Sequence, residues 1–259
     1  MSRLLEEIVA HKRAEVAEAQ QRLPLEELQR RLTHHQRERD FTAALRRQGR
    51  LSLIAELKRQ SPSAGMLRER FDPISIAQTY ESSGAAALSV LTDTRYFGGQ
   101  LHFLRDIRDF TEIPLLRKEF IIDEYQIYES AWAGADAVLL IVRLLSPETL
   151  RRFVAVAAAA QLDALVEVHS EPELEAALAA GAQLIGMNHR DLDTLQVDLT
   201  LSERLAPRIP KDHTLVAESG LHTRADLECL RALGVHAVLI GEAFMTAPDI
   251  AAKVRELMG

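Results

Sequence analysis

Four segments of this chain repeat one pattern, in which a glycine is followed at once by a run of apolar residues. The glycines stand at positions 84, 134, 181 and 234, and so lie 50, 47 and 53 residues apart. A glycine in this setting typically ends a helix in the left-handed conformation, and the apolar run after it forms a buried strand. Four further apolar runs alternate with the repeats, at 53–58, 114–119, 164–169 and 214–219. The chain therefore contains eight predicted strands.

Amphipathic segments with helical spacing separate these strands. Several begin with favourable N-terminal residues, such as Ser146-Pro147-Glu148 and Glu171-Pro172-Glu173. Eight buried strands that alternate with eight helices predict an α/β fold, the (β/α)8 TIM barrel. An open doubly wound sheet is the alternative, but it usually has fewer strands, and no G-x-G-x-x-G follows the first strand here. The predicted helices are 74–83, 101–110, 124–133, 147–160, 171–180, 200–206, 223–232 and 248–258.

The chain before the first strand has a helical pattern of its own. Leu4, Leu5, Ile8 and Val9 predict one apolar stripe on a first helix. Pro24 begins a second predicted helix, and Asp40 is a suitable N-cap for a third. We therefore expect one domain over residues 1–259, with a helical extension at 1–48 and the barrel at 49–259.

Composition narrows the class of protein. A hydrophobic content of 47% is sufficient for a large core, and a net charge of −7 argues against nucleic acid as a partner. The one cysteine, Cys229, excludes an internal disulfide and suits a reducing compartment; we expect it to be a buried thiol in a helix. No signal-peptide pattern and no apolar run of membrane-spanning length is present. These features predict a cytoplasmic protein with no membrane partner.

Charged residues gather at the ends of alternate predicted strands. Glu56 and Lys58 stand at the end of the first strand, Lys118 and Glu119 at the end of the third, and Glu167 and Glu218 at the ends of the fifth and seventh. Alternate strands of a barrel supply one layer of side chains, and barrel active sites lie at the C-terminal mouth. We therefore expect these charges to meet in one ring that forms an active site.

The last two strands predict a phosphate site. Ser219 and Gly220 follow the seventh strand, and Gly241 and Glu242 follow the eighth, before a short helical turn. Loops in these positions commonly bind phosphate through backbone N–H groups, which glycine allows to approach the anion closely. After the sixth strand, Asn188 can donate to a substrate oxygen and Arg190 can pair with a carboxylate. His189 is expected to be a loop residue, and the histidines show no spacing that predicts a metal site.

Several ordered motifs are similar to one enzyme family. The motifs are Glu56-Leu57-Lys58-Arg59-Gln60-Ser61-Pro62-Ser63, Leu91-Thr92-Asp93, Tyr96-Phe97-Gly98-Gly99, Leu116-Arg117-Lys118-Glu119-Phe120, Val166-Glu167-Val168, the run from Ile185 to Leu192, and Ala217-Glu218-Ser219-Gly220. The match runs from about residue 3 to the end of the chain, and in these motifs the chain resembles indole-3-glycerol phosphate synthase.

The resemblance implies a lyase of tryptophan biosynthesis that closes the indole ring with loss of carbon dioxide and water, without a cofactor or metal. It implies a phosphorylated small-molecule substrate, 1-(2-carboxyphenylamino)-1-deoxyribulose 5-phosphate, and a monomer or weak homo-oligomer. Lys118 would be the general acid, Lys58 would contact the substrate carboxylate and share the acid role, and Glu167 would be the base. The remaining implied contacts are Glu56, Asn188 and Glu218 on the polar groups of the substrate, Phe97 and Arg190 in the substrate site, and Ser61, Ser219, Gly220, Gly241 and Glu242 around the phosphate.

Two other functions fit the same fold. A phosphosugar isomerase needs an acid and a base but no cationic pocket for a leaving carboxylate, so the pair Lys58 and Lys118 favours the synthase. A barrel that only binds a phosphosugar would keep the glycines and could dispense with Glu56 and Glu167. The sequence leaves open which lysine donates the proton at each step.

Overall fold

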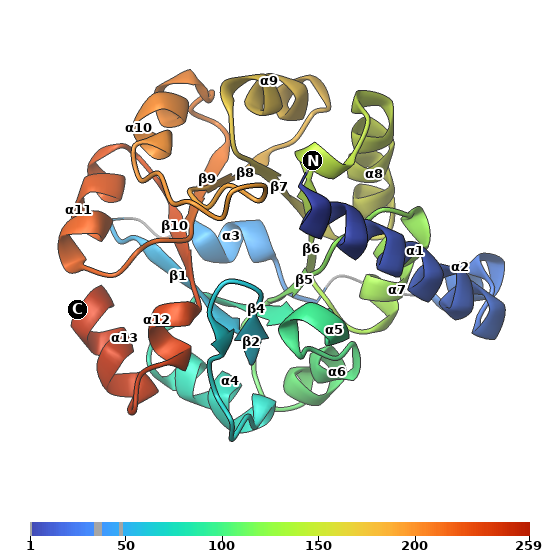
Figure 1. Cartoon of the computed structure of the whole chain (residues 1–259), viewed down its shortest axis with the longest axis horizontal. Coiled ribbons are helices and arrows are strands. Elements are labelled where there is room, and N and C mark those ends of the chain that lie inside the picture. Colours follow the sequence, from blue (N-terminus) through green and yellow to red (C-terminus); the bar gives the residue numbers. More distant parts are fainter. Residues whose placement is uncertain (1, 34–37, 47–48) are drawn as a thin grey trace.

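The computed structural model describes residues 2–33, 38–46 and 49–259. Within these residues, eight parallel strands close into a barrel in the order β1-β10-β9-β8-β7-β6-β5-β4. Figure 1 looks down this barrel and shows the ring of strands surrounded by helices. The strands are β1 (Ser52–Leu57), β4 (Ala87–Leu91), β5 (Leu115–Lys118), β6 (Ala137–Ile141), β7 (Asp163–Val168), β8 (Leu184–Asn188), β9 (Thr214–Glu218) and β10 (Ala237–Ile240). The predicted (β/α)8 barrel is confirmed.

The outer helices agree with the predicted segments to within about two residues. Gly84, Gly134, Gly181 and Gly234 all have positive φ, at 92°, 89°, 84° and 81°, as expected for glycines that end helices. Cys229 does lie in a helix, but it is exposed, so the expectation of a buried thiol was wrong. The helices are α4 (Pro73–Ser82), α6 (His102–Arg108), α7 (Glu124–Trp132), α8 (Pro147–Ala159), α9 (Glu171–Ala179), α10 (Leu201–Leu205), α11 (Arg224–Ala232) and α13 (Ile250–Met258).

Short elements occupy several loops at the C-terminal mouth. The loop after the first strand contains a small antiparallel hairpin, in which Gln60 pairs with Met66. A short helix was expected after the last strand, and α12 fills that place. These elements are β2 (Gln60–Ser61), β3 (Gly65–Met66), α5 (Thr94–Phe97), α12 (Glu242–Met245) and the 3-10 turn η1 (Val142–Leu144). A second 3-10 turn, η2 (Ala206–Arg208), follows α10 and leads into β9 at the other end of the barrel.

The N-terminal extension contacts both ends of the barrel. It consists of α1 (Arg3–Arg22), α2 (Leu25–Arg31) and α3 (Phe41–Leu45), and Asp40 caps α3 as predicted. Leu5 and Ile8 of α1 join the core of the barrel interior. Phe41 and Leu45 of α3 join the same core from the opposite end, where Thr42 donates to Asp163 at the start of β7. In Figure 1, α1 crosses the front of the barrel and α3 is visible through the ring.

The apolar stripe on α1 differs from the predicted one. Leu5 and Ile8 are buried, but Leu4 and Val9 are only partly buried. The buried face continues instead through Lys12 and Val16. Of the predicted stripe, Leu5 and Ile8 are thus buried, and Leu4 is partly buried against the same core. Residues 34–37 and 47–48, which were also expected to be helical, lie outside the described residues.

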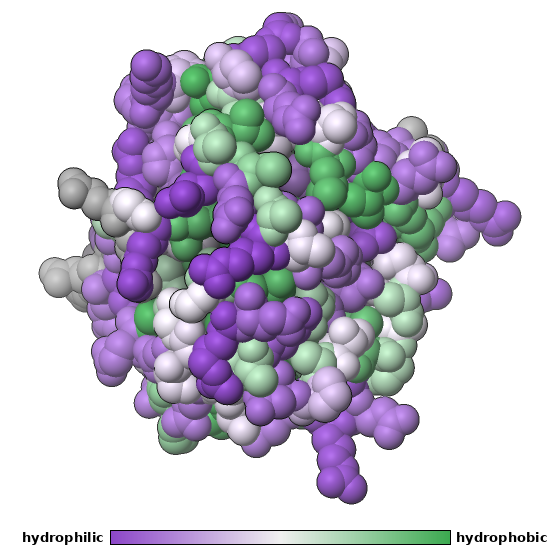
Figure 2. Space-filling model, turned by 90° about the vertical axis from the view of Figure 1, so that its left-hand side faces the viewer, coloured by the Kyte–Doolittle hydropathy of each residue, from purple (hydrophilic) through white to green (hydrophobic). Residues whose placement is uncertain are grey.

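The outer surface has no single dominant apolar face in the view of Figure 2. The side shown there is mostly hydrophilic, with hydrophobic residues in small patches. Among the helices that the structure describes, none has both the length and the apolar composition needed to cross a bilayer.

Candidate active site

The alternation of residues along the barrel strands sets the position of the charged side chains. Leu53, Ala55 and Leu57 of β1 pack in the layer shared with the helices, whereas Ile54 belongs to the barrel interior. Glu56 is two residues beyond Ile54, so it points to the interior as well. The same spacing of two residues relates Leu116 to Lys118, Leu165 to Glu167 and Val216 to Glu218. The sequence thus places a charged layer directly above an apolar layer at the C-terminal mouth.

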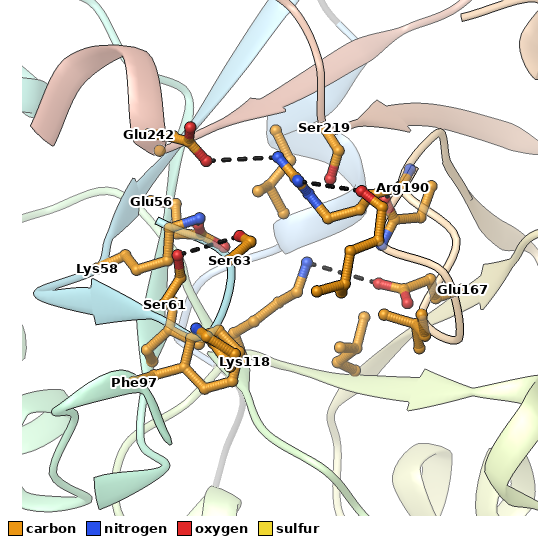
Figure 3. Close-up of a pocket in the computed structure, with 18 of the residues that line it drawn as sticks. Glu56, Lys58, Ser61, Ser63, Phe97, Lys118, Glu167, Arg190, Ser219 and Glu242 are labelled. Atoms are coloured by element: carbon orange, nitrogen blue, oxygen red, sulfur yellow. Dashed lines mark hydrogen bonds and ion pairs between the residues drawn. The ribbon is translucent and has the colours of Figure 1, made fainter. Parts of the chain in front are cut away.

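These charged side chains contact one another as expected from alternate strands. The Nζ atom of Lys118 lies 2.5 Å from Oε2 of Glu218 and 3.6 Å from Oε2 of Glu167. The Nζ atom of Lys58, one residue beyond β1, lies 3.0 Å from Oε2 of Glu56. Figure 3 shows the Lys118 side chain extended across the pocket toward Glu167. Two lysines and three carboxylates therefore share one buried site.

Two barrel glycines make room for these carboxylates. A Cβ atom at position 186 would overlap Oε1 of Glu218, and one at position 241 would overlap Oε2 of Glu56. Gly186 belongs to β8 and Gly241 follows β10, so each glycine is on a strand next to the carboxylate it accommodates. We inferred from the sequence that Gly241 serves a phosphate group, but the structure also explains it by the space that Glu56 needs.

The pKa values in the ring reflect burial and mutual charge. Burial alone would lower the pKa of Lys118, but Glu218, Glu167 and Glu56 outweigh it and raise that pKa. Burial alone would raise the pKa of Glu167, but Lys118, His169 and Asn188 together outweigh it, and the pKa is lowered. Burial raises the pKa of Glu218, since Lys118 only partly opposes it. The lysine at the centre is thus an ammonium ion, flanked by one carboxylate that stays ionised and one that takes up a proton more readily.

A pocket opens above this ring, and nearly all of the predicted site residues line it. Its polar wall contains Glu56, Lys58, Ser61, Lys118, Glu167, Asn188, Arg190, Ser219, Gly220, Gly241 and Glu242. Glu218 is not among the side chains that line the pocket; it contacts Lys118, which does, and its expected contact with substrate stays a prediction.

The opposite wall of the pocket is apolar. Phe97 and Phe120 lie there with ring centroids 6.0 Å apart, next to Leu139 and Ile141 of β6. Leu5 and Ile8 of α1 complete this wall. The pocket therefore combines a charged floor with an apolar side of a size and character that suit an aromatic ring.

The loop after β9 has an unusual backbone. Ser219 and Gly220 both have positive φ, at 68° and 73°, and a serine rarely adopts this conformation. His189 supports it from below: Nδ1 lies 3.0 Å from the Ser219 carbonyl oxygen, and Nε2 lies 2.7 Å from Oγ of Ser202. Because a carbonyl only accepts, Nδ1 carries the proton. His189 follows β8 as the expected loop residue, but it is buried, with 2% of its surface exposed, and it supports the Ser219 loop.

Arg190 and Glu242 lie at the rim of the pocket. Nη2 of Arg190 is 3.4 Å from Oε2 of Glu242, and the two side chains point toward one another in Figure 3. From the sequence alone, a salt bridge from Arg190 to Asp191 was conceivable, but Asp191 pairs with Arg143 at 2.8 Å. Arg190 therefore offers a cation in the same pocket wall as Ser219 and Gly220, and Glu242 is its ion-pair partner.

A second buried cluster fixes α1 to the mouth, and the sequence reasoning missed it. The Nζ atom of Lys12 lies 3.0 Å from Oδ2 of Asp93 and 3.0 Å from Oε1 of Glu119. Glu119, expected in the ring with Lys118, belongs to this cluster instead. A signal was available, because Lys12 is four residues after Ile8 and four before Val16 and so lies on the same face of α1.

His169 is the other site residue that the sequence reasoning missed. It follows β7 directly, two residues after Glu167, and its Nε2 atom lies 3.2 Å from Oε1 of that glutamate. The spacing of two residues at a strand end was the available signal. Within the described ranges, no group of three or more His, Cys, Asp or Glu side chains is arranged to hold a metal ion.

Comparison with known proteins gives a consistent result. Residues 5–257 match the family model of indole-3-glycerol phosphate synthase. An indole-3-glycerol phosphate synthase of Acetivibrio thermocellus is 48% identical over 255 residues, which cover 98% of this chain and 98% of that protein. One of Dehalococcoides mccartyi is 51% identical over 219 residues, or 83% of this chain and 85% of that protein.

A solved structure supports the fold alone. The crystal structure of a 3-hexulose-6-phosphate synthase aligns with a TM-score of 0.65 at 18% identity, covering 80% of this chain and 98% of that one. At this level of identity, the likeness extends to the barrel and carries no information on the reaction.

Proposed function

This chain belongs to the indole-3-glycerol phosphate synthase family, and we propose that the pocket at the barrel mouth is where it carries out the ring closure of that family. The reaction converts 1-(2-carboxyphenylamino)-1-deoxyribulose 5-phosphate to indole-3-glycerol phosphate, with loss of carbon dioxide and water. The observation that supports this site most directly is Lys118, held between Glu167 and Glu218 at the edge of an apolar pocket. This arrangement supplies an acid and a base beside a place for an aromatic ring.

The first step is carbon–carbon bond formation between the aromatic ring and the ribulose carbonyl. The ring carbon that bears the carboxylate attacks the carbonyl carbon, and the carbonyl oxygen becomes a hydroxyl as Lys118 donates a proton to it. Lys58 pairs with the substrate carboxylate in place of Glu56, until that group leaves as carbon dioxide. The aromatic ring lies between Phe97 and the apolar side chains of α1 that line the pocket.

The second part of the reaction removes the new hydroxyl group as water. An acid protonates the hydroxyl, and Glu167 accepts a proton to complete the elimination. Glu167 suits the role of base because neighbouring cations keep it ionised. Asn188 and Glu56 bind the substrate hydroxyls, and Glu218 balances the charge of Lys118. The phosphate is held by Ser61, Ser219, Gly220 and Gly241, with Arg190 beside them.

We further propose that the chain acts in the cytoplasm, as one domain that is a monomer or weak homo-oligomer. The decisive experiment is a fluorescence assay for indole-3-glycerol phosphate with the purified protein. Production of the fluorescent indole by the wild-type protein and its loss in Lys118→Met would support the proposal. Equal rates from both proteins would refute the placement of the site.

A further inference from the structure

His169 is a buried titratable side chain for which the reaction described above has no use. It follows β7, and 2% of its side chain is exposed. Its ring lies between two carboxylates: Nε2 is 3.2 Å from Oε1 of Glu167, and Nδ1 is 3.1 Å from Oε2 of Glu173. An ionised carboxylate only accepts hydrogen bonds, so both ring nitrogens face acceptors. The contact to Glu173 has the geometry of a hydrogen bond, whereas the contact to Glu167 is an ion pair without that geometry, so the ring bridges the two carboxylates as an imidazolium.

The side of the imidazole that faces away from the pocket is held by Glu173. Oε2 of Glu173, in the first turn of α9, also accepts the backbone N–H of His169 at 2.7 Å. Oε1 of Glu173 accepts from Nε of Arg143 at 2.9 Å, and Arg143 in turn reaches Asp191 in the loop after β8. A chain of alternating charges thus runs from this loop through Arg143, Glu173 and His169 to Glu167. Each member fixes the orientation of the next.

On the side of the ring that faces the pocket, His169 contacts Glu167, whose two carboxylate oxygens have different partners. Oε1 faces His169, whereas Oε2 faces Nζ of Lys118 at 3.6 Å. The ion pair with His169 attracts Oε1 away from the pocket and so favours the orientation in which Oε2 faces Lys118; Asn188 is a further partner of this carboxylate. Figure 3 shows Glu167 at the side of the pocket with Lys118 pointing toward it.

We propose that His169 is a positioning residue for Glu167, which it holds through one oxygen so that the other oxygen faces the pocket. The inference rests on the proposed function, in which Glu167 is the base. A misplacement of about 1 Å in a reacting group can reduce turnover about a hundredfold. The contact at 3.2 Å is thus sufficient to affect the rate without any direct contact with substrate.

Two substitutions of His169 distinguish its contact with Glu167 from its contact with Glu173. The amide nitrogen of Asn occupies approximately the place of Nδ1, so His169→Asn keeps the contact to Glu173 and loses that to Glu167. The amide nitrogen of Gln occupies approximately the place of Nε2, so His169→Gln keeps a donor for Glu167. We expect His169→Asn to lose about 10- to 100-fold in kcat with KM within about twofold of wild type, and His169→Gln to retain at least several times more activity.

A matched control tests for general damage. His213 is also buried, with 8% exposed, but it precedes β9 at the end of the barrel opposite the pocket. We expect His213→Asn to lower the thermal midpoint and to leave kcat of the folded enzyme unchanged. Folded enzyme is counted by titration with a phosphorylated product analogue. If His169→Asn retains the wild-type kcat, or if the Asn and Gln variants lose kcat equally, the proposal is overturned.

A second readout does not depend on activity. The titratable groups that face the ring are Glu167 of β7 and Glu173 of α9, with Lys118 and Arg143 behind them. In ¹⁵N NMR spectra at pH 7, both ring nitrogens of His169 should be protonated in the wild type, and Glu167→Gln should shift the titration to lower pH. A neutral ring at pH 7, or a titration that Glu167→Gln does not change, would overturn the pairing. If the wild-type protein makes no indole-3-glycerol phosphate, the proposed function fails, while the NMR result still decides the contact.

Discussion

Gly186 and Glu218 fit together across the neighbouring strands β8 and β9, because the carboxylate occupies the space that a side chain at 186 would fill. Glu218 is almost fully buried, with 1% exposed, so it cannot swing to solvent without opening the barrel. Its buried position beside Lys118 thus depends on a residue with no side chain. Gly241 stands in the same relation to Glu56.

The first prediction concerns this pair. Gly186→Ala should lower the free energy of unfolding by about 1–3 kcal/mol, the usual cost of overfilling a packed interior. In a Glu218→Ala background the same substitution should cost much less, because the overlapping carboxylate is absent. Denaturant unfolding of the wild type, both single variants and the double variant gives the coupling energy. Simple additivity would show that the two positions do not compete for space.

The second prediction concerns Lys118. Lys118→Met should fold and lose at least about 10²-fold in kcat, the low end of the effect of a general acid. The substitution removes the cation that three buried carboxylates share, so the pKa values of Glu167 and Glu218 should rise. Steady-state kinetics and circular dichroism are the measurements. A folded variant with near-normal turnover would remove Lys118 from the mechanism.

The third prediction concerns the loop after β9. Gly220 has a φ of 73°, and a Cβ there would meet Val197. Gly220→Ala should therefore weaken a phosphorylated product analogue by about tenfold or more, and the dephosphorylated analogue much less. Gly234→Ala is the control, because it has similar positive φ with nothing within 4 Å of the added Cβ. Calorimetry measures the affinity of each variant for both analogues. If Gly220→Ala weakened the binding of both analogues equally, Gly220 would matter for folding and not for phosphate binding.

The fourth prediction separates the two ends of the extension. Deletion of residues 1–40 should raise KM and lower the thermal midpoint, because α1 lines the pocket and Lys12 anchors it. Ile8→Ala, at the mouth, should also raise KM. Phe41→Ala, at the opposite end, should lower stability by about 3–5 kcal/mol and leave KM unchanged. If Phe41→Ala raised KM and Ile8→Ala did not, substrate would bind at the end of the barrel opposite the proposed pocket.

The fifth prediction is a pH dependence of stability. Burial alone would lower the pKa of His169, but Glu167 and Glu173 raise it from 6.5 to about 9. The folded state therefore binds this proton more tightly than the unfolded state. The resulting stabilisation, on the order of 3 kcal/mol, is fully present below pH 6.5 and is lost as the pH rises through 9.

His169→Gln tests this dependence directly. The difference in free energy of unfolding between the wild type and this variant should be largest near pH 6 and should shrink toward pH 10. Denaturant titrations at both pH values measure it. A difference that does not vary with pH would mean that the ring is not charged in the folded protein.

The order of elements and the layer of charges were predictable from the sequence because both follow from local patterns. Gly84 and its three counterparts mark the end of a helix through backbone freedom alone. The spacing of two residues between Ile54 and Glu56 fixes their common face in any strand. Closure of a barrel then brings alternate strands to one layer, so Lys118, Glu167 and Glu218 were expected to meet.

Tertiary structure decided which of these charges pair. Glu119 is adjacent to Lys118, yet it turns to Lys12, about a hundred residues away in sequence, because successive strand residues face opposite sides. Likewise, Arg190 pairs with Glu242 and not with its neighbour Asp191. The role of Gly186 is visible only where two strands lie side by side. Local spacing sets the direction of a side chain, but the identity of its partner depends on which distant segments the fold packs against it.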